Sequence, residues 1–145
     1  MSIFNSMYVS STGMTAQRTR MDVISQNIAN VNTTRDASGN VYKRKMVVFQ
    51  EKTQVPFDNI LTNKINTYEA NGVRITRVVE DRSEGRMVYD PGHPDADENG
   101  YVTYPNVDTV TEMTNLIDSS RAYEANATAF NTAKSIAMKG LELFN

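Results

Sequence analysis

The stretch from Asn106 to Asn145, NVDTVTEMTNLIDSSRAYEANATAFNTAKSIAMKGLELFN, decides the fold. Its apolar side chains recur in alternating steps of three and four residues. Eight of the ten positions in this series are apolar or aromatic, and the series runs through Met113, Leu116, Ser120, Tyr123, Ala127, Phe130, Lys134, Ala137, Leu141 and Phe144. Such spacing places a narrow stripe along one helix, as in the seam of a coiled coil. A helix of this length, roughly 50 Å, needs a second long helix to cover its stripe.

The other end of the chain offers that second helix, between Ser2 and Val31. Seven of nine positions in its stripe are apolar, again in steps of four and three: Ile3, Met7, Ser10, Met14, Gln17, Met21, Ile24, Ile28 and Val31. Matching periods at the two termini predict that the chain ends pair along their length. The spacing leaves open whether the partner helix belongs to the same chain, as in an antiparallel hairpin, or to another copy.

The middle of the chain predicts a small antiparallel β-rich insert. Asn71-Gly72 is a hairpin-turn signal, and Phe57 to Tyr68 is irregular or partly extended. Four extended segments are expected at Val41 to Lys52, Val73 to Val79, Met87 to Tyr89 and Gly100 to Tyr104. The fold class is therefore α+β, with long N- and C-terminal helices pairing as a coiled coil around the insert. The expected parts are an N-terminal helix at 1–32, the insert at 33–105 and a C-terminal helix at 106–145.

The start of the C-terminal helix carries a capping signal. Thr109 and Glu112 have the spacing of a capping box, and Asn106 and Asp108 are alternative caps.

Composition narrows the range of partners. The 145 residues include 15 basic and 17 acidic side chains and no cysteine, for a net charge of −2. This charge argues against nucleic acid or an anionic membrane as the main partner. No apolar run reaches the length of a membrane span, so we expect no direct membrane insertion. The N-terminus lacks the features of a cleaved signal peptide.

One loop resembles a metal site. The segment from Asp95 to Gly100 matches the opening of a calcium-binding EF-hand loop, but Asn106 stands where the bidentate glutamate belongs. A solvated acidic turn is the favoured interpretation. His93, the only histidine, is interpreted as a loop residue without a catalytic role. The cluster Lys43-Arg44-Lys45 is interpreted as a solvated strand or a contact to an acidic neighbour. We therefore expect no enzyme activity, no catalytic residue, no metal ligand and no cofactor.

Three stretches together resemble a known family. The segment Ser25-Gln26-Asn27-Ile28-Ala29-Asn30-Val31-Asn32-Thr33 is similar to the N-terminal signature of bacterial flagellar rod, hook and related axial proteins. The second stretch is the loop from Asp90 to Val107, and the third combines Glu112-Met113, Arg121-Ala122-Tyr123 and Ala125-Asn126. The last two, with Tyr42-Lys43-Arg44-Lys45, resemble the proximal-rod members of that family. The match covers nearly the whole chain.

The resemblance implies a structural subunit of the flagellar basal body. Members of the family leave the cell unfolded through the flagellar type III export apparatus, without a cleaved signal peptide. They assemble into a hollow rod across the periplasm, with paired terminal helices lining its inner tube. The implied partners are copies of the chain itself, neighbouring proximal and distal rod proteins, a rod-base adaptor and the export apparatus.

Two alternatives remain open at this point. The first is another flagellar axial subunit, which the loop from Asp90 to Asn106 argues against because that motif is typical of proximal-rod members. The second is a small calcium- or ligand-binding helical module, which the missing glutamate argues against.

The helical stripes and the family signature supply the expected subunit-interface residues. We expect Asn27 and Asn30 to bond the backbone or a neighbouring subunit near the end of the first helix. The full set is Ile3, Met7, Met14, Met21, Ile24, Asn27, Ile28, Asn30, Val31, Met113, Leu116, Tyr123, Phe130 and Leu141.

Both terminal helices are predicted to be largely disordered in the free chain. Ser10, Ser11, Thr12 and Gly13 lie together in the first helix and cost it on the order of a few kcal/mol relative to alanine. Circular dichroism of the dilute monomer should therefore show far less helix than the fully folded helices would give. A helix content of about 45% or more would contradict the prediction.

Overall fold

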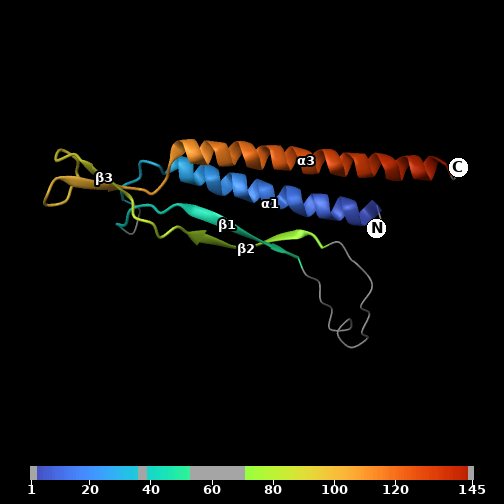
Figure 1. The fold of residues 1–145 in the computed structure, drawn as a ribbon, viewed down its shortest axis with the longest axis horizontal. Helices are drawn as coiled ribbons and strands as arrows, with labels where there is room; N and C mark the ends of the chain where they lie inside the picture. The colour runs from blue at the N-terminus through green and yellow to red at the C-terminus, as the bar shows by residue number, and fades with distance from the viewer. Residues whose placement is uncertain (1–2, 36–38, 53–70, 144–145) are drawn as a thin grey trace, which may run out of the picture. The chain divides into compact units, whose positions relative to one another are not determined.

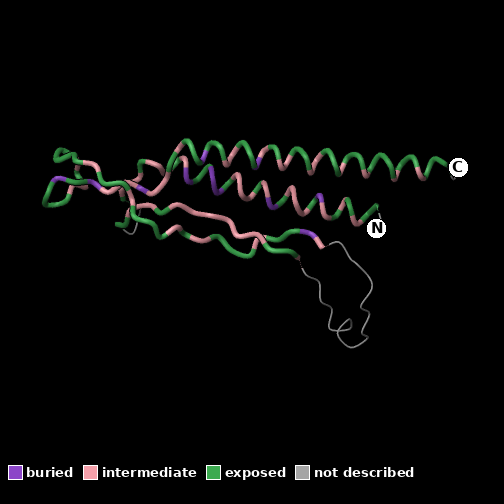
Figure 2. The backbone as a smooth tube through the Cα atoms, viewed as in Figure 1, coloured by how far each residue is buried: buried purple, intermediate pink, exposed green. Residues whose placement is uncertain are grey.

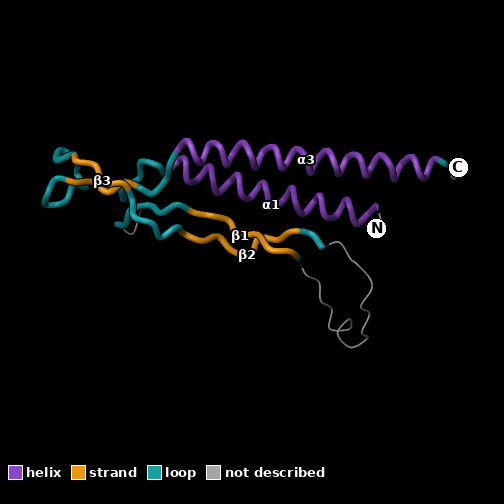
Figure 3. The backbone as a smooth tube through the Cα atoms, viewed as in Figure 1, coloured by secondary structure: helices purple, strands orange, loops and turns teal. Residues whose placement is uncertain are grey.

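A computed structural model describes residues 3–35, 39–52 and 71–143. Two long helices, α1 (Ile3–Ala29) and α3 (Thr109–Glu142), flank a β insert (Figures 1 and 3). The insert contains β1 (Lys45–Glu51), β2 (Val73–Glu80), β3 (Arg86–Tyr89) and β4 (Tyr101–Tyr104). The predicted α+β class is confirmed. Within the described residues, neither helix combines the length and apolarity needed to cross a bilayer.

The chain divides into two compact units, each built from several segments. The first contains Met1–Arg18, Phe49–Thr76 and Ser120–Asn145, and the second contains Thr19–Val48 and Arg77–Ser119. Each unit therefore holds a segment of α1 and a segment of α3. Within each unit these two segments lie side by side and run in opposite directions (Figure 1).

The insert forms two two-stranded sheets. Backbone hydrogen bonds from Asp81 N to Arg44 O and from Lys52 N to Gly72 O show that β1 and β2 run antiparallel. In the second sheet, β3 and β4 are antiparallel, with Val88 opposite Val102. Val102 is fully buried, and it provides the apolar centre of this hairpin. The part of the insert expected at Phe57 to Tyr68 lies outside the described residues.

The Asn71-Gly72 signal does not form the predicted tight turn. Both residues precede β2, and Gly72 accepts the Lys52 amide at 2.6 Å, so the connection between β1 and β2 is much longer than two residues. A Cβ atom at Gly72 would lie 2.3 Å from Thr12 Oγ1. The glycine therefore serves the close approach of this strand to α1, a requirement that the local sequence does not reveal.

Asp108, one of the two alternative caps in the sequence, caps helix α3, whereas the predicted capping box of Thr109 and Glu112 is wrong. The Asp108 carboxylate accepts the Thr111 backbone amide at 3.0 Å and the Thr111 hydroxyl. Both bonds lower the pKa of Asp108, and the bond from the Thr111 hydroxyl has the larger effect. Its stabilising charge at the helix N-terminus is therefore present above the usual aspartate pKa and is lost only as the pH falls through the lowered one. Glu112 does not reach back to Thr109, because its carboxylate is used elsewhere.

The buried side of α3 differs from the predicted stripe. Glu112 and Ser119 are its fully buried residues, at 1% and 0% exposure, whereas Met113 and Leu141 from the predicted stripe are 52% and 69% exposed (Figure 2). Six positions of the predicted stripe are half-buried, as expected for a face that packs: Leu116, Ser120, Tyr123, Ala127, Phe130 and Ala137. On the inward side of α3, the buried Glu112 and Ser119 therefore alternate with the half-buried Leu116 and Tyr123, and large apolar side chains such as Met113 lie outside.

Candidate functional site: a buried polar junction and an exposed apolar ridge

Asn27 is the centre of a buried junction in the second unit. Its side chain is fully buried, and all four of its hydrogen-bonding positions are used. The amide nitrogen donates to Lys45 O and to Glu112 Oε2, both at 2.8 Å. The amide oxygen accepts the Tyr42 hydroxyl and the Lys45 backbone amide, both at 2.9 Å. One side chain thus links α1 to α3 and to the first strand of the insert.

Arg44 neutralises the buried carboxylate. Its Nε and Nη2 atoms both donate to Glu112 Oε1, at 2.8 and 2.7 Å. Its Nη1 atom lies 3.9 Å from Asp81 Oδ2. A buried carboxylate is tolerated only when it is paired and hydrogen-bonded, and Glu112 meets both conditions. We call Asn27, Tyr42, Arg44 and Glu112 the polar junction.

Tyr42 remains a donor within the polar junction. Burial raises the pKa of its phenol, and the negative charges of Glu112 and Glu80 raise it further. Since a raised pKa favours the protonated form, the hydroxyl keeps its proton and its bond to Asn27 until the solution becomes strongly alkaline. The stabilisation from this bond is therefore full below the ordinary tyrosine pKa and is lost as the pH rises through the raised one.

Asn106 fastens the end of the insert to the same region. Its Oδ1 atom accepts the Arg44 backbone amide at 2.8 Å, and its Nδ2 atom donates to Ser83 Oγ at 2.8 Å. Bonds from the Ser83 amide and hydroxyl lower the pKa of Asp81, which keeps this carboxylate charged near Arg44. The loop just before α3 is therefore held to the residue that precedes β1 and to the connection between β2 and β3.

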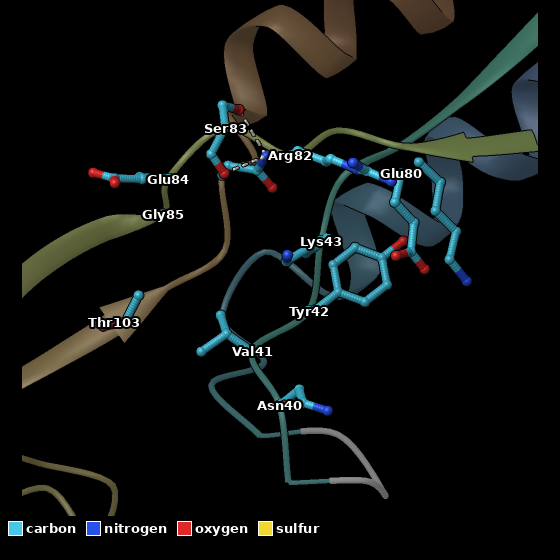
Figure 4. Close-up of a pocket in the computed structure, with 12 residues that line it drawn as sticks. Asn40, Val41, Tyr42, Lys43, Glu80, Arg82, Ser83, Glu84, Gly85 and Thr103 are labelled. Atoms are coloured by element: carbon cyan, nitrogen blue, oxygen red, sulfur yellow. Dashed lines mark hydrogen bonds between the residues drawn. The ribbon is translucent and has the colours of Figure 1, made fainter.

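An open groove of about 750 Å³ lies beside the polar junction. Figure 4 shows Tyr42 next to Glu80, with Lys43 and Arg82 also at its wall. The Lys45 ammonium lies 5.6 Å from the centre of the Tyr42 ring. The wall of the groove carries charges of both signs. None of the residues that line it pairs a nucleophile with a general base in the way that catalysis needs.

The acidic loop uses its carboxylates within the fold. Asp97 Oδ1 accepts the amides of Asn99 and Tyr101 at 2.9 and 2.8 Å, and Gly100 has a φ of +80° that this turn requires. Asp95 instead bonds Arg35 at 3.0 Å and Thr34 at 2.8 Å. Across the described ranges, no three His, Asp or Glu side chains are placed to hold a metal ion. The loop thus has the bonding of a solvated acidic turn.

His93 shapes the same loop. Its Nδ1 atom accepts the Asp95 amide at 3.1 Å, and its ring centre lies 6.5 Å from that of Tyr104. These contacts are those of a structural loop residue.

The residues expected at a subunit interface fall into three groups. Ile24 and Asn27 are buried inside the second unit, whereas Ile3, Met113 and Leu141 are exposed. The half-buried ones are Met7, Met14, Met21, Ile28, Asn30, Val31, Leu116, Tyr123 and Phe130. Asn30 bonds the Gln26 carbonyl at 2.8 Å, so both signature asparagines bond the backbone as expected.

An exposed apolar ridge runs along α3 in the second unit. Val110, Met113 and Ile117 follow one another at steps of three and four and are 72%, 52% and 53% exposed. Separately, the first unit also exposes large apolar side chains on its helices, namely Ile3, Phe4, Tyr8, Ile136, Met138, Leu141 and Leu143. Large contiguous patches of exposed apolar surface are typical of sites that contact other proteins.

The sequence does not assign Glu112 and Arg44 to one site, although both lie in the stretches that resemble the family. Glu112 was interpreted as part of a helix cap, and Arg44 as one member of a basic cluster facing solvent or an acidic neighbour. The second of those interpretations is confirmed, because the neighbour is Glu112. A carboxylate in the inward row of a coiled-coil helix was the available signal.

Comparisons with known proteins agree along the whole chain. Residues 7–35 match the family described as Flagella basal body rod protein, and residues 98–143 match Flagellar basal body rod FlgEFG protein C-terminal. The chain is 46% identical to Flagellar basal-body rod protein FlgC of Bacillus subtilis (strain 168), over 99% of both chains. It is 42% identical to the FlgC protein of Borreliella burgdorferi and 36% identical to that of Salmonella typhimurium, in each case over 99% of this chain and 98% of the relative.

The junction predicts a specific effect of neutralising Glu112. In a Glu112→Gln variant, Arg44 keeps only the more distant Asp81 as a charged partner, and the loss of its charged hydrogen bonds should cost about 1.5–3 kcal/mol. Amide hydrogen exchange of the peptide 109–116 in the assembled protein should therefore be about tenfold faster or more. The exposed Asp118→Asn change in the same helix is the control and should leave exchange unchanged. Equal exchange in the Glu112→Gln variant and the unmodified protein would contradict the prediction.

Proposed function

The chain belongs to the FlgC family of flagellar basal-body rod proteins, and from this premise we propose that it builds the proximal part of the rod across the periplasm. It is a structural subunit of the basal-body rod. We assign it no catalytic role. We propose export through the flagellar type III apparatus without a cleaved signal peptide. Its proposed partners are copies of itself, the other proximal and distal rod proteins, and the adaptor at the base of the rod.

One observation carries this proposal: helix α3 buries polar residues against its own chain and exposes large apolar ones to solvent. Glu112 and Ser119 lie inside, whereas Val110, Met113 and Ile117 face outward. A helix that turns apolar residues away from its own chain gains little from folding alone, because the apolar surface stays in water. Contacts with neighbouring subunits would remove that surface from water. Assembly then stabilises the helices, as expected for a chain whose terminal helices are weak in isolation.

The exposed members of the expected interface set are the strongest candidates for contacts between subunits. Ile3, Met113 and Leu141 lie on the surface of their units and are available to a neighbouring chain. The half-buried members keep part of their surface exposed, and a neighbouring subunit can cover that part. Repeated contacts between non-equivalent surfaces produce an open helical assembly when the rotation from one subunit to the next does not close into a ring. This is the architecture that a shaft requires.

An in-frame deletion in a flagellated host tests both the location and the surface. The deletion strain should make basal bodies with membrane rings but without rod, hook or filament, as seen by electron microscopy. The unmodified gene should restore complete flagella. A Met113→Asp variant should be made at normal level but should restore neither rods nor swimming, because a charge would enter the subunit contact. An Asp118→Lys variant, a charge change at an exposed polar position on the other side of Ile117 from Met113, is the matched control and should restore both.

Two outcomes would contradict the proposal. Complete flagella in the deletion strain would remove the proposed place in the proximal rod. Normal rods and normal swimming with Met113→Asp would leave the place intact but would exclude the ridge on α3 as a subunit contact.

A further inference from the structure

The two helices meet through two contacts that share one register. In the second unit, Asn27 of α1 bonds Glu112 of α3 at 2.8 Å. In the first unit, Gly13 of α1 faces Asn126 of α3, and a Cβ atom at Gly13 would lie 2.7 Å from Asn126 Oδ1. Each helix advances by two heptads from one contact to the other, in opposite directions along the chain. Both contacts therefore belong to a single antiparallel register.

The apolar residues of the pair cannot choose this register by themselves. The half-buried residues Leu116, Tyr123 and Phe130 repeat every seven residues on α3, as Ala16 and Val23 do on α1. Sliding one helix by a heptad replaces one apolar neighbour by another. Such a repeat favours pairing but leaves the register weakly specified.

Asn27 and Glu112 distinguish the observed register from its neighbours. Both side chains are buried, at 0% and 1% exposure, and each bonds the other. A slide of one heptad separates them and leaves a buried carboxylate without one of its donors. A buried polar residue at a seam position is known to fix register at some cost in stability.

Gly13 and Asn126 form a second, steric restriction. Asn126 Nδ2 donates to the Ala122 carbonyl of its own helix at 2.7 Å, so its amide needs no partner across the seam. The Asn126 side chain does need room between the helices, and the absence of a side chain at Gly13 provides that room. In a shifted register, Asn126 would meet a residue that has a side chain, because the α1 positions one heptad on either side of Gly13 are Ser6 and Arg20. This accounts for a glycine in the middle of a helix, where alanine would otherwise be preferred.

We propose that Asn27, Glu112, Gly13 and Asn126 are specificity-determining residues that select the register of the helix pair and thereby exclude its shifted forms. This role goes beyond membership of the rod and does not depend on the subunit's place along it. In a subunit with a shifted pair, the exposed apolar side chains of one helix would be displaced along the helix axis relative to those of the other. They would then no longer match the contact surface of a neighbouring subunit.

Engineered cysteine pairs report the register, because the chain has no cysteine of its own. Four residues before Asn27 and four after Glu112, the observed register places Val23 opposite Leu116. Shifts of one heptad place Val23 opposite Tyr123, or Ala16 opposite Leu116. A heptad is about 10 Å of helix, and a disulfide spans no more than about 7 Å between Cα atoms. Oxidation of assembled protein carrying Val23→Cys with Leu116→Cys therefore reports the observed register, and the other two pairs report the shifted ones.

The variant to test combines Glu112→Leu, Gly13→Ala and Asn126→Ala. All three replacements are good helix formers, and Asn27 keeps its bonds to Tyr42 and Lys45. The matched control carries the same kinds of change at sites away from these contacts, namely Glu124→Leu, Asn131→Ala and Gly140→Ala. Glu124 and Asn131 are exposed, and a Cβ atom at Gly140 would meet nothing within 4 Å.

The unmodified protein and the control should form only the cross-link between positions 23 and 116, within one chain. The triple variant should in addition form at least one of the shifted cross-links. If the triple variant forms only the cross-link at 23 and 116, the register is set elsewhere, and the proposal is overturned. If all cross-links disappear in the triple variant, these residues merely hold the helices together, and the proposal is overturned as well.

Discussion

The bond between Asn27 and Glu112 is the interaction on which the rest of the second unit depends. Burying a carboxylate costs several kcal/mol unless donors replace the lost water. Here Asn27 supplies one donor and the Arg44 guanidinium supplies two, while the remaining bonds of Asn27 hold the Lys45 backbone and the Tyr42 hydroxyl. The end of α1, the start of α3 and the start of β1 are thus tied by one set of mutually dependent bonds. Since Asn27 and Glu112 are both buried away from water, removing one leaves the other without a replacement for that bond.

A polar interior on α3 has a consequence for its outer surface. The inward positions of the helix hold Glu112 and Ser119. Large apolar side chains lie outside, where Val110, Met113 and Ile117 form a ridge. The inward positions select the register of the helix pair. The outward apolar side chains favour association with neighbouring subunits, because association removes them from water. In a rod subunit these two tasks are complementary, because the chain must adopt one defined helix pair and still remain incomplete until it meets its neighbours.

The sequence predicted the elements well and their partners poorly. The three-four spacing located both helices to within about three residues at each end, because helical periodicity is a local property. The inward side of α3 differs from the predicted stripe because apolar Met113 and Leu141 lie on the outer surface, whereas polar Glu112 and Ser119 lie inside. Glu112 was assigned to a local cap, since nothing near it in the sequence reveals Arg44 or Asn27 as its partners, 68 and 85 residues away. Gly72 likewise resembled a turn residue, although its role is set by Thr12, a residue remote in the sequence. Family signatures identified Asn27 but not its bonds.

Electron cryo-microscopy of the rod in isolated basal bodies, at a resolution that shows side chains, tests the central claim most directly. The account predicts that α1 and α3 of the same chain pair with Asn27 within hydrogen-bonding distance of Glu112. It also predicts that neighbouring subunits cover Met113 and Ile117. A rod in which α1 pairs with α3 of another chain, or in which the ridge on α3 faces water, would contradict the account.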